Sequence, residues 1–224
     1  MGRVGSRVMP PGGAVVGVPR GRPSTKLVLA GMLALVGAIL AGASLAGPWW
    51  RVGWQEGVYY SSTTDFGLFG YADVWDSEWA GGGLYLGNYA TRPNVEGVML
   101  MAMVLAGGGI ANGVAGASLA LAGARRPDLR AGAVLFTLVG GLLGVVISTY
   151  LMTSLPGSVI DDFAAWYKFT WVSGFWGRAN LAGATVTWGA GWAWYTEVVG
   201  SVLMFMSGVL GVASARVWPA SSPG

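Results

Sequence analysis

Four uncharged apolar stretches dominate the pattern of hydrophobic and polar positions along the chain. They cover residues 27–47, 97–124, 131–153 and 198–215. A helix needs about 20 residues to cross the hydrocarbon core of a bilayer, so each stretch predicts a transmembrane helix. We therefore expect a membrane all-α four-helix bundle within a domain that covers residues 27–217.

Two long segments of mixed polarity, residues 48–96 and 154–197, separate these stretches. Long connections without structure of their own are uncommon in folded proteins. Three runs in them alternate in polarity or are rich in β-formers, namely Gly57–Ser62, Gly83–Tyr89 and Ala184–Trp188. We expect the two segments to form a small antiparallel β-sheet that caps one end of the helix bundle.

The remaining segments are short or rich in helix breakers. Residues 1–26 are rich in Gly, Pro and Arg and lack apolar periodicity, which predicts a disordered basic tail. Residues 218–224 are predicted to form a second, shorter tail. Residues 125–130 form a basic turn that contains a proline, so the second and third helices should be antiparallel neighbours.

Charged residues divide unequally between the two sides of this topology. The side with both chain ends and the basic turn carries nine basic residues and one acid, whereas the side with the two long loops carries four basic residues and nine acids. Because cytoplasmic loops of membrane proteins are enriched in Lys and Arg, we expect a multi-pass cell-membrane protein with both termini in the cytoplasm. This bias explains the net charge of +3, and we predict no nucleic-acid partner.

The sequence contains no cysteine and no histidine. Disulfides, Cys/His zinc sites, His-ligated haem and the commonest general base are therefore excluded. Carboxylates cluster in the outer loops at Asp73, Asp76, Asp161 and Asp162, but no calcium loop, Walker motif or hydrolase motif accompanies them. We predict no cofactor, no metal site and no enzyme activity. A membrane enzyme that uses these carboxylates remains a weaker alternative.

Small residues recur at four-residue spacing in the apolar stretches, a pattern that lets helices approach closely. They pack the helices of one bundle or, alternatively, of neighbouring copies. Asn112 is the one strongly polar side chain deep within a stretch, and we expect it to hydrogen-bond between helices. The predicted helix-packing residues are Gly109, Asn112, Gly113, Gly140, Gly144 and Gly211.

Acidic residues are expected only at the ends of the helices. Glu96 and Glu197 precede the second and fourth stretches, where an acid favours the positive end of the helix dipole. Proton pumps and secondary transporters usually need ionisable groups inside the membrane. With none expected there, these functions are disfavoured.

Tryptophan is concentrated on the outer side, which contains eleven of the twelve residues. Those that flank the helices, such as Trp49, are typical of an interface belt. The surplus indicates a cap core that is held together without disulfides, a protein-binding surface, or stacking on sugars, in that order of preference.

Two short motifs follow the first helix. Pro48-Trp49-Trp50-Arg51 resembles the Pro-x-Trp-Arg that opens the first outer loop of claudins, and Gly67-Leu68-Phe69 resembles their Gly-Leu-Trp, with Phe in place of Trp. Arg92 is similar to a basic residue found before the second helix. The order of helices and loops also resembles the claudin and peripheral-myelin-protein-like superfamily, although the cysteine pair that follows Gly-Leu-Trp is absent.

This resemblance implies a left-handed four-helix bundle beneath a small outer sheet, with no enzyme activity. It also implies a role in cell contact, in membrane organisation, or as an auxiliary subunit. Together these patterns predict a non-catalytic membrane protein that contacts lipids and forms a homo-oligomer or a larger complex. The alternative is an accessory subunit of a respiratory, photosynthetic or channel complex. The residues predicted to form the cap core or bind a partner are Trp50, Arg51, Trp54, Gly67, Leu68, Phe69, Trp75, Trp79, Trp171, Trp176 and Trp188.

Overall fold

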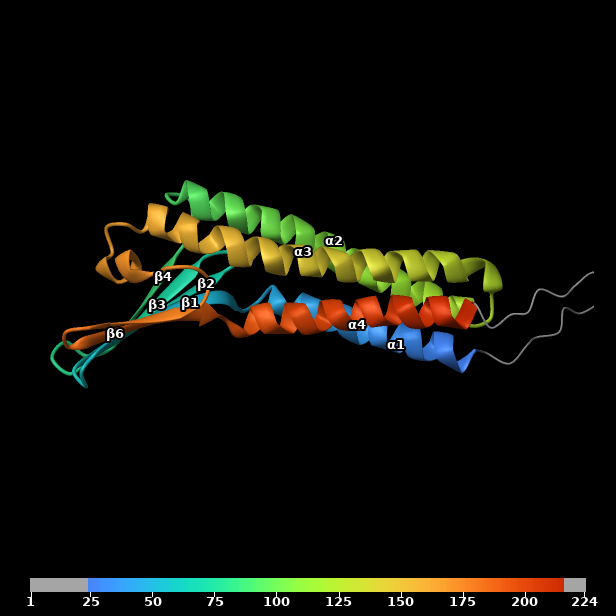
Figure 1. Cartoon of the computed structure of the whole chain (residues 1–224), viewed down its shortest axis with the longest axis horizontal. Coiled ribbons are helices and arrows are strands. Elements are labelled where there is room, and N and C mark those ends of the chain that lie inside the picture. Colours follow the sequence, from blue (N-terminus) through green and yellow to red (C-terminus); the bar gives the residue numbers. More distant parts are fainter. Residues whose placement is uncertain (1–23, 216–224) are drawn as a thin grey trace, which may run out of the picture.

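The computed structural model describes residues 24–215, which form an elongated helix bundle with a β-sheet at one end (Figure 1). Two 3-10 helices, η1 and η2, accompany four long helices. The helices are α1 (Thr25–Ser44), α2 (Pro93–Gly123), η1 (Pro127–Leu129), α3 (Arg130–Asp162), η2 (Tyr167–Trp171) and α4 (Trp192–Ala215). Apart from residues 24–26, where α1 begins, both predicted tails lie outside the described residues.

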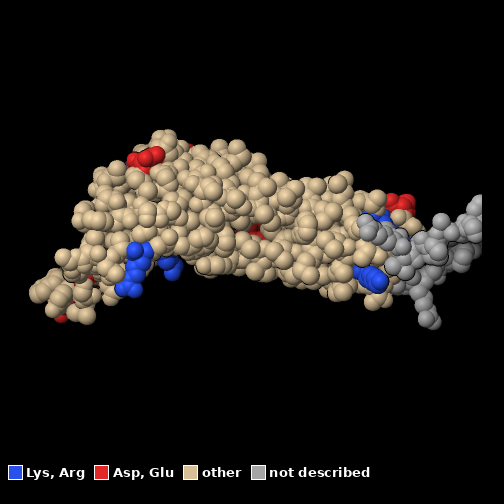
Figure 2. All heavy atoms as spheres, viewed as in Figure 1, with Lys and Arg blue, Asp and Glu red and all other residues tan. Residues whose placement is uncertain are grey.

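All four long helices are apolar enough and long enough to cross a membrane, which confirms the prediction of four such helices. Helix α1 packs against α2 and α4, and α3 packs against the same two helices, so the four form a closed ring. Figure 2 shows the charged side chains gathered toward the two ends of the molecule, with very few in the long middle section of this face.

The third helix is longer than its apolar stretch predicted. Helix α3 continues past residue 153 to Asp162. Leu155 and Val159, both completely buried, extend its buried face onto the sheet. Pro156 lies within this extension and removes one backbone hydrogen bond. The packing of its neighbours keeps the segment helical.

The other helix boundaries also differ from the predicted ones. Helix α2 begins at Pro93, four residues before its apolar stretch, because proline is favoured in the first turn of a helix. Helix α4 begins at Trp192, six residues early. Helix α1 ends at Ser44, three residues early, because the chain turns there into the first strand. The pattern of apolar stretches does not predict helix ends that contain aromatic or polar residues.

A six-stranded antiparallel sheet forms the cap, with the strand order β4-β3-β2-β1-β6-β5. The first long loop contributes four strands and the second contributes two, which confirms a sheet built from both loops. The strands are β1 (Pro48–Glu56), β2 (Tyr60–Gly67), β3 (Tyr71–Ser77), β4 (Gly83–Gly87), β5 (Gly177–Leu181) and β6 (Ala184–Ala190). The run predicted at Gly57–Ser62 divides between a turn at residues 57–59, where Gly57 adopts a positive φ of 53°, and the first three residues of β2.

The two faces of the sheet have different surroundings. In β1, Trp50 and Val52 are completely buried, whereas Arg51 between them is exposed. The buried face packs against Phe163 at the end of α3 and Phe169 in η2. Because successive side chains of a strand point to opposite faces, the residues in register with Arg51 share the opposite face, here called the open face. Arg51 is exposed on this face, and the Trp176 ring covers Gly189 at its edge.

Candidate functional site

An aromatic cluster forms the core of the cap. Phe66, Phe163 and Phe169 are completely buried, and their ring centroids lie 5.3–5.9 Å apart. Trp50 lies 5.6 Å from the Phe66 ring, and Tyr71 lies 5.0 Å from that of Phe163. Phenylalanine and tyrosine thus supply much of the packing that the sequence pattern attributed to tryptophan.

Three tryptophans of strands β1 and β6 are buried. The Trp50 indole donates a 2.8 Å hydrogen bond to the Phe175 carbonyl. Trp49, which the sequence placed in an interface belt, is instead completely buried, and its indole donates to the Ser44 carbonyl at 2.9 Å. Trp188 is 7% exposed and packs over Gly177. Trp49 therefore connects the end of α1 to the cap.

The other predicted tryptophans lie nearer the surface. Trp54 and Trp75 are half-buried on the inner side of the sheet. Trp171 and Trp176 are exposed, and the Trp176 ring covers Gly189. Trp79 is 83% exposed.

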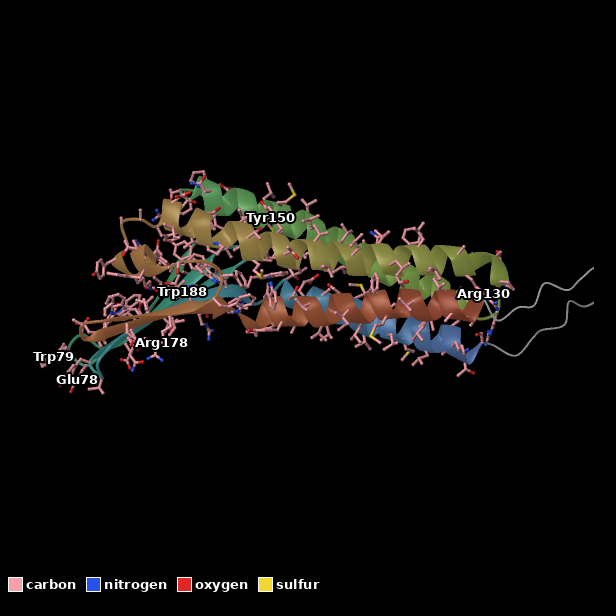
Figure 3. All side chains as sticks on the ribbon, viewed as in Figure 1. Glu78, Trp79, Arg130, Tyr150, Arg178 and Trp188 are labelled. Carbon is pink, nitrogen blue, oxygen red and sulfur yellow. The ribbon has the colours of Figure 1, made fainter. Side chains whose placement is uncertain are left out.

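An aromatic tip marks the end of the sheet that lies farthest from the helices. Figure 3 shows Trp79 and Glu78 at this end. The rings of Trp79 and Tyr59 lie 6.3 Å apart, and Val58 beside them is 88% exposed. Val58, Tyr59 and Trp79, here called the distal tip, form an unpaired apolar surface with the acidic side chain of Glu78 beside it.

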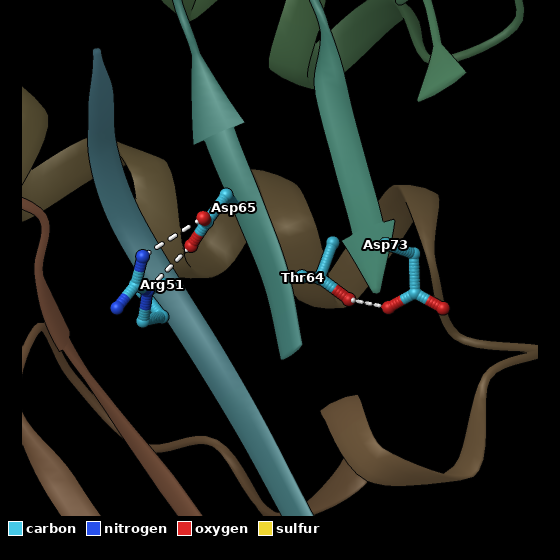
Figure 4. Close-up of polar contacts among 4 residues, drawn as sticks. All are labelled: Arg51, Thr64, Asp65 and Asp73. Carbon is cyan, nitrogen blue, oxygen red and sulfur yellow. Dashed lines mark hydrogen bonds and ion pairs between the residues drawn. The ribbon is translucent and has the colours of Figure 1, made fainter. Parts of the chain in front are cut away.

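The first motif after α1 places an ion pair on the open face of the sheet. Arg51 and Asp65 pair through two hydrogen bonds of 2.5 and 2.9 Å (Figure 4). These two residues face each other across β1 and β2. Hydrogen bonding to Asp65 raises the pKa of Arg51, so the guanidinium stays charged.

The second motif turns the chain from β2 into β3. The Tyr89 hydroxyl lies 2.7 Å from the Gly67 carbonyl and 2.9 Å from that of Gly70, and donates to this pair of acceptors. Burial raises the pKa of Tyr89, so its phenol keeps the proton. Leu68 is buried, whereas Phe69 is 70% exposed. Of these two neighbours, Leu68 supports the core and Phe69 belongs to the surface.

A pocket of about 360 Å³ opens between the inner side of the sheet and η2. Its lining combines aromatic walls with a polar floor. Lys168, only 8% exposed, donates hydrogen bonds to Ser62 (2.8 Å) and Asp73 (2.6 Å). Burial lowers the pKa of Lys168, and the hydrogen bond and charge of Asp73 oppose that shift. The residues that line this Lys168 pocket are Trp54, Tyr60, Ser62, Asp73, Trp166, Tyr167 and Lys168.

The clustered carboxylates that the sequence singled out have separate structural partners. Asp73 also accepts a 2.5 Å hydrogen bond from Thr64 (Figure 4). Asp162 accepts 2.8 Å hydrogen bonds from the Val95 backbone and the Asn94 amide, which ties the end of α3 to the start of α2. Arg92, whose guanidinium lies 4.4 Å from the Phe163 ring centroid, donates to the Asp162 carbonyl.

The remaining acids, Asp76 and Asp161, are exposed. Among the described residues, no group of three or more acidic side chains could hold a metal ion.

Glu197 does not cap α4, as its position before the apolar stretch had suggested. It is the sixth residue of the helix and is completely buried. Its carboxyl group accepts a 2.8 Å hydrogen bond from Ser44 on α1 and lies 3.4 Å from the Ser201 hydroxyl. The expectation that no acid lies inside the bundle is therefore wrong. Glu96, by contrast, lies exposed in the first turn of α2.

The predicted packing glycines lie at contacts between helices of this bundle. Added Cβ atoms at Gly109 and Gly140 would each meet the other residue's carbonyl, while those at Gly113 and Gly211 would meet Met204 and Val134. At Gly144 a Cβ would overlap the Ser201 hydroxyl oxygen and would lie 2.9 Å from the Glu197 carboxyl. These contacts lie within one chain.

Asn112 bonds differently from the expectation. Its amide donates to the Gly108 carbonyl one turn earlier in α2, at 2.8 Å, rather than to another helix. Helix α3 approaches closely here, since an added Cβ at Gly140 would lie 3.4 Å from the Asn112 Cβ. The Asn112 amide therefore hydrogen-bonds within its own helix.

The length and composition of the helices define a candidate four-span, multi-pass membrane protein with a β-sheet cap. No protein-family model matches the sequence, and no curated protein is significantly similar to it.

Proposed function

We propose that this chain is a non-catalytic integral membrane protein that acts in cell-surface contact or self-assembly through its aromatic outer cap. The observation that carries this proposal is the distal tip, where Trp79 and Val58 are more than four-fifths exposed. Isolated exposed apolar residues are common, but a cluster of large ones marks an interaction surface. Tryptophan and tyrosine dominate the energetics of such surfaces.

The location of the tip suits contact with another molecule. The sheet carries it to the end of the protein farthest from the helix bundle (Figure 1, Figure 3). The excess of basic residues on the opposite side of the topology favours a cap outside the cell. The resemblance of the first outer loop to claudins favours the same kind of role.

Internal packing of the glycines favours assembly through the cap over assembly through helix contacts. Gly113, Gly140 and Gly144 contact other helices of the same chain, so these three glycines are not available for close packing against a neighbour. The separate partners of Asp73 and Asp162 support a non-catalytic role.

A second candidate function, an accessory subunit of a larger membrane complex, is favoured by the open face of the sheet. Val74, Leu84 and Leu86 lie on this face near its edge and are 49–71% exposed. Co-purification of a defined set of subunits, lost on substitution of Leu84 and Leu86 by serine, would support this candidate.

The leading proposal is tested by reconstituting the purified full chain in lipid vesicles and measuring vesicle clustering by light scattering, together with its mass in mild detergent. We expect clustering or oligomers with the wild type, and a large loss of both with Val58→Ser combined with Trp79→Ala. Trp171→Ala, which removes an exposed tryptophan outside the tip, is the matched control. A monomeric wild-type protein that clusters no vesicles would sink the proposal.

A further inference from the structure

The floor of the Lys168 pocket presents hydrogen-bonding groups that the described residues leave available. A lysine ammonium has three donors, and Lys168 uses two of them, on Ser62 and Asp73. The Ser62 oxygen accepts from Lys168 and keeps its own proton to donate. Oδ1 of Asp73 receives hydrogen bonds from Thr64 (Figure 4) and from Lys168, whereas Oδ2 receives none from the described residues. Two donors and one acceptor thus lie side by side.

These floor groups are held in place before any ligand arrives. Lys168 is 8% exposed and is enclosed by the Trp166 and Phe169 rings, whose centroids lie 5.5 and 5.6 Å from its ammonium nitrogen. Asp73 and Ser62 extend from adjacent strands of the sheet. A polar group fixed by a rigid scaffold loses little conformational entropy when it binds a ligand.

Aromatic rings form the walls above this floor. The rings of Trp54 and Tyr167 lie 5.6 Å apart with an interplanar angle of 65°, and Tyr60 and Trp166 complete the lining. The face of an aromatic ring carries partial negative charge, so it attracts C–H groups whose carbon is bonded to oxygen. The volume of about 360 Å³ falls within the usual range for small-molecule sites, about 300–1,000 Å³.

The charge of the pocket selects among ligand classes. Asp73 and Lys168 compensate each other, so the floor has little net attraction for a phosphate or for a free cation. An anion would meet the Asp73 carboxylate, and a cation would meet the Lys168 ammonium. A neutral ligand with adjacent hydroxyls avoids both conflicts, because a hydroxyl can donate to the carboxylate and accept from the ammonium.

We propose that the Lys168 pocket binds a neutral saccharide. One hydroxyl donates to Oδ2 of Asp73 and accepts the third N–H of Lys168, and its neighbour accepts from Ser62. The C–H face of the sugar ring packs on the Trp54 and Tyr167 rings. None of the lining residues belongs to the distal tip, so the proposal does not depend on the contact function.

The test is ligand-observed NMR on the purified full chain in lauryldimethylamine oxide, a detergent without a sugar headgroup. The probes are cellobiose, maltose and N,N′-diacetylchitobiose, with inorganic phosphate as the charged comparison. We expect at least one disaccharide to bind the wild type. Asp73→Asn should weaken that binding by about tenfold, because a neutral amide replaces a charge-assisted hydrogen bond.

Two further variants separate binding from folding. Tyr167 is 62% exposed, so Tyr167→Ala should fold normally and yet lose most of the saccharide signal. Trp79→Ala, which removes an exposed tryptophan outside the pocket, should bind like the wild type even if it fails to cluster vesicles. The proposal is overturned if no disaccharide binds, if Tyr167→Ala and Asp73→Asn bind as the wild type does, or if inorganic phosphate displaces the sugar.

Discussion

At the scale of single residues, Lys168 gives the fold a dependence on alkaline pH. Burial lowers its pKa in the folded protein, while in the unfolded chain Lys168 has the ordinary lysine pKa of about 10.4. Just below that pH Lys168 binds more protons in the unfolded chain, so its own contribution to stability rises with pH, whereas the contribution of Tyr89, whose pKa burial raises, falls as the pH passes the ordinary range of tyrosine. Lys168→Met should remove the rise and Lys26→Met, at an exposed position, should keep it. Thermal unfolding followed by tryptophan fluorescence checks this, and identical pH profiles for both variants would contradict it.

Lys168 and Glu197 are the two buried residues of charged type among the described residues, and the surroundings of Glu197 contrast with those of Lys168. The Ser44 hydroxyl lies 2.7 Å from the Ala41 carbonyl as well as 2.8 Å from the Glu197 carboxyl, and Ser201 bonds the Glu197 backbone carbonyl at 2.7 Å. The hydroxyl groups of Ser44 and Ser201 thus each contact a backbone carbonyl oxygen of a helix and also the Glu197 carboxyl group. None of the ion pairs among the described residues involves Glu197. The acid therefore joins α1 to α4 by neutral hydrogen-bonding partners.

At the scale of helices, the approach of α3 to α4 depends on Gly144. An added Cβ there would overlap the Ser201 side chain, so Gly144→Ala must push the two helices apart, at a cost of about 1–3 kcal/mol of stability. Gly157 lies in the same helix, with no atom within 4 Å of an added Cβ. Gly157→Ala should therefore be neutral or stabilising by up to about 1 kcal/mol. Unfolding temperatures in detergent measure the difference, and equal effects would refute the packing role of Gly144.

The same scale shows what the sequence could and could not predict. The apolar stretches identified all four helices because hydrocarbon-spanning segments are uniformly apolar. They missed the last turns of α3, where Leu155 and Val159 are buried in a core that contains residues of α2 as well as residues of the sheet. They also misplaced Glu197, because a single acid next to an aromatic run resembles a helix start. Burial within the bundle is decided by neighbours that the local pattern does not contain.

The amino-acid composition of the two long loops was the only feature of the sequence that indicated the candidate site. The surplus of outer tryptophans pointed to a folded cap, yet Trp79 is exposed while Trp49 is buried. Lys168 and Asp73 are 95 positions apart in the chain, and neither lies in a motif. The pairing of β1 with β6 brings the two loops together. The pocket therefore depends on long-range pairing, because it is lined by strands of the first loop and by η2 of the second loop.

At the scale of the whole molecule, the predicted orientation can be tested because the chain contains no cysteine. A single introduced cysteine is then the only site for a maleimide reagent. Ala80→Cys lies in the turn beside the tip and Asp128→Cys lies in the η1 turn, at the opposite end of the bundle. With the cap outside, as the basic residues favour, a membrane-impermeant maleimide should label Ala80→Cys in intact cells.

Under the same orientation, Asp128→Cys should react only after the membrane is permeabilised. Both positions are exposed, so a difference in labelling reports sidedness rather than burial. The reverse pattern would place the cap and the distal tip in the cytoplasm. Contact between cells would then be impossible for this surface, while assembly through the cap within one cell would remain open. The labelling experiment therefore decides between the two forms of contact that the aromatic tip allows.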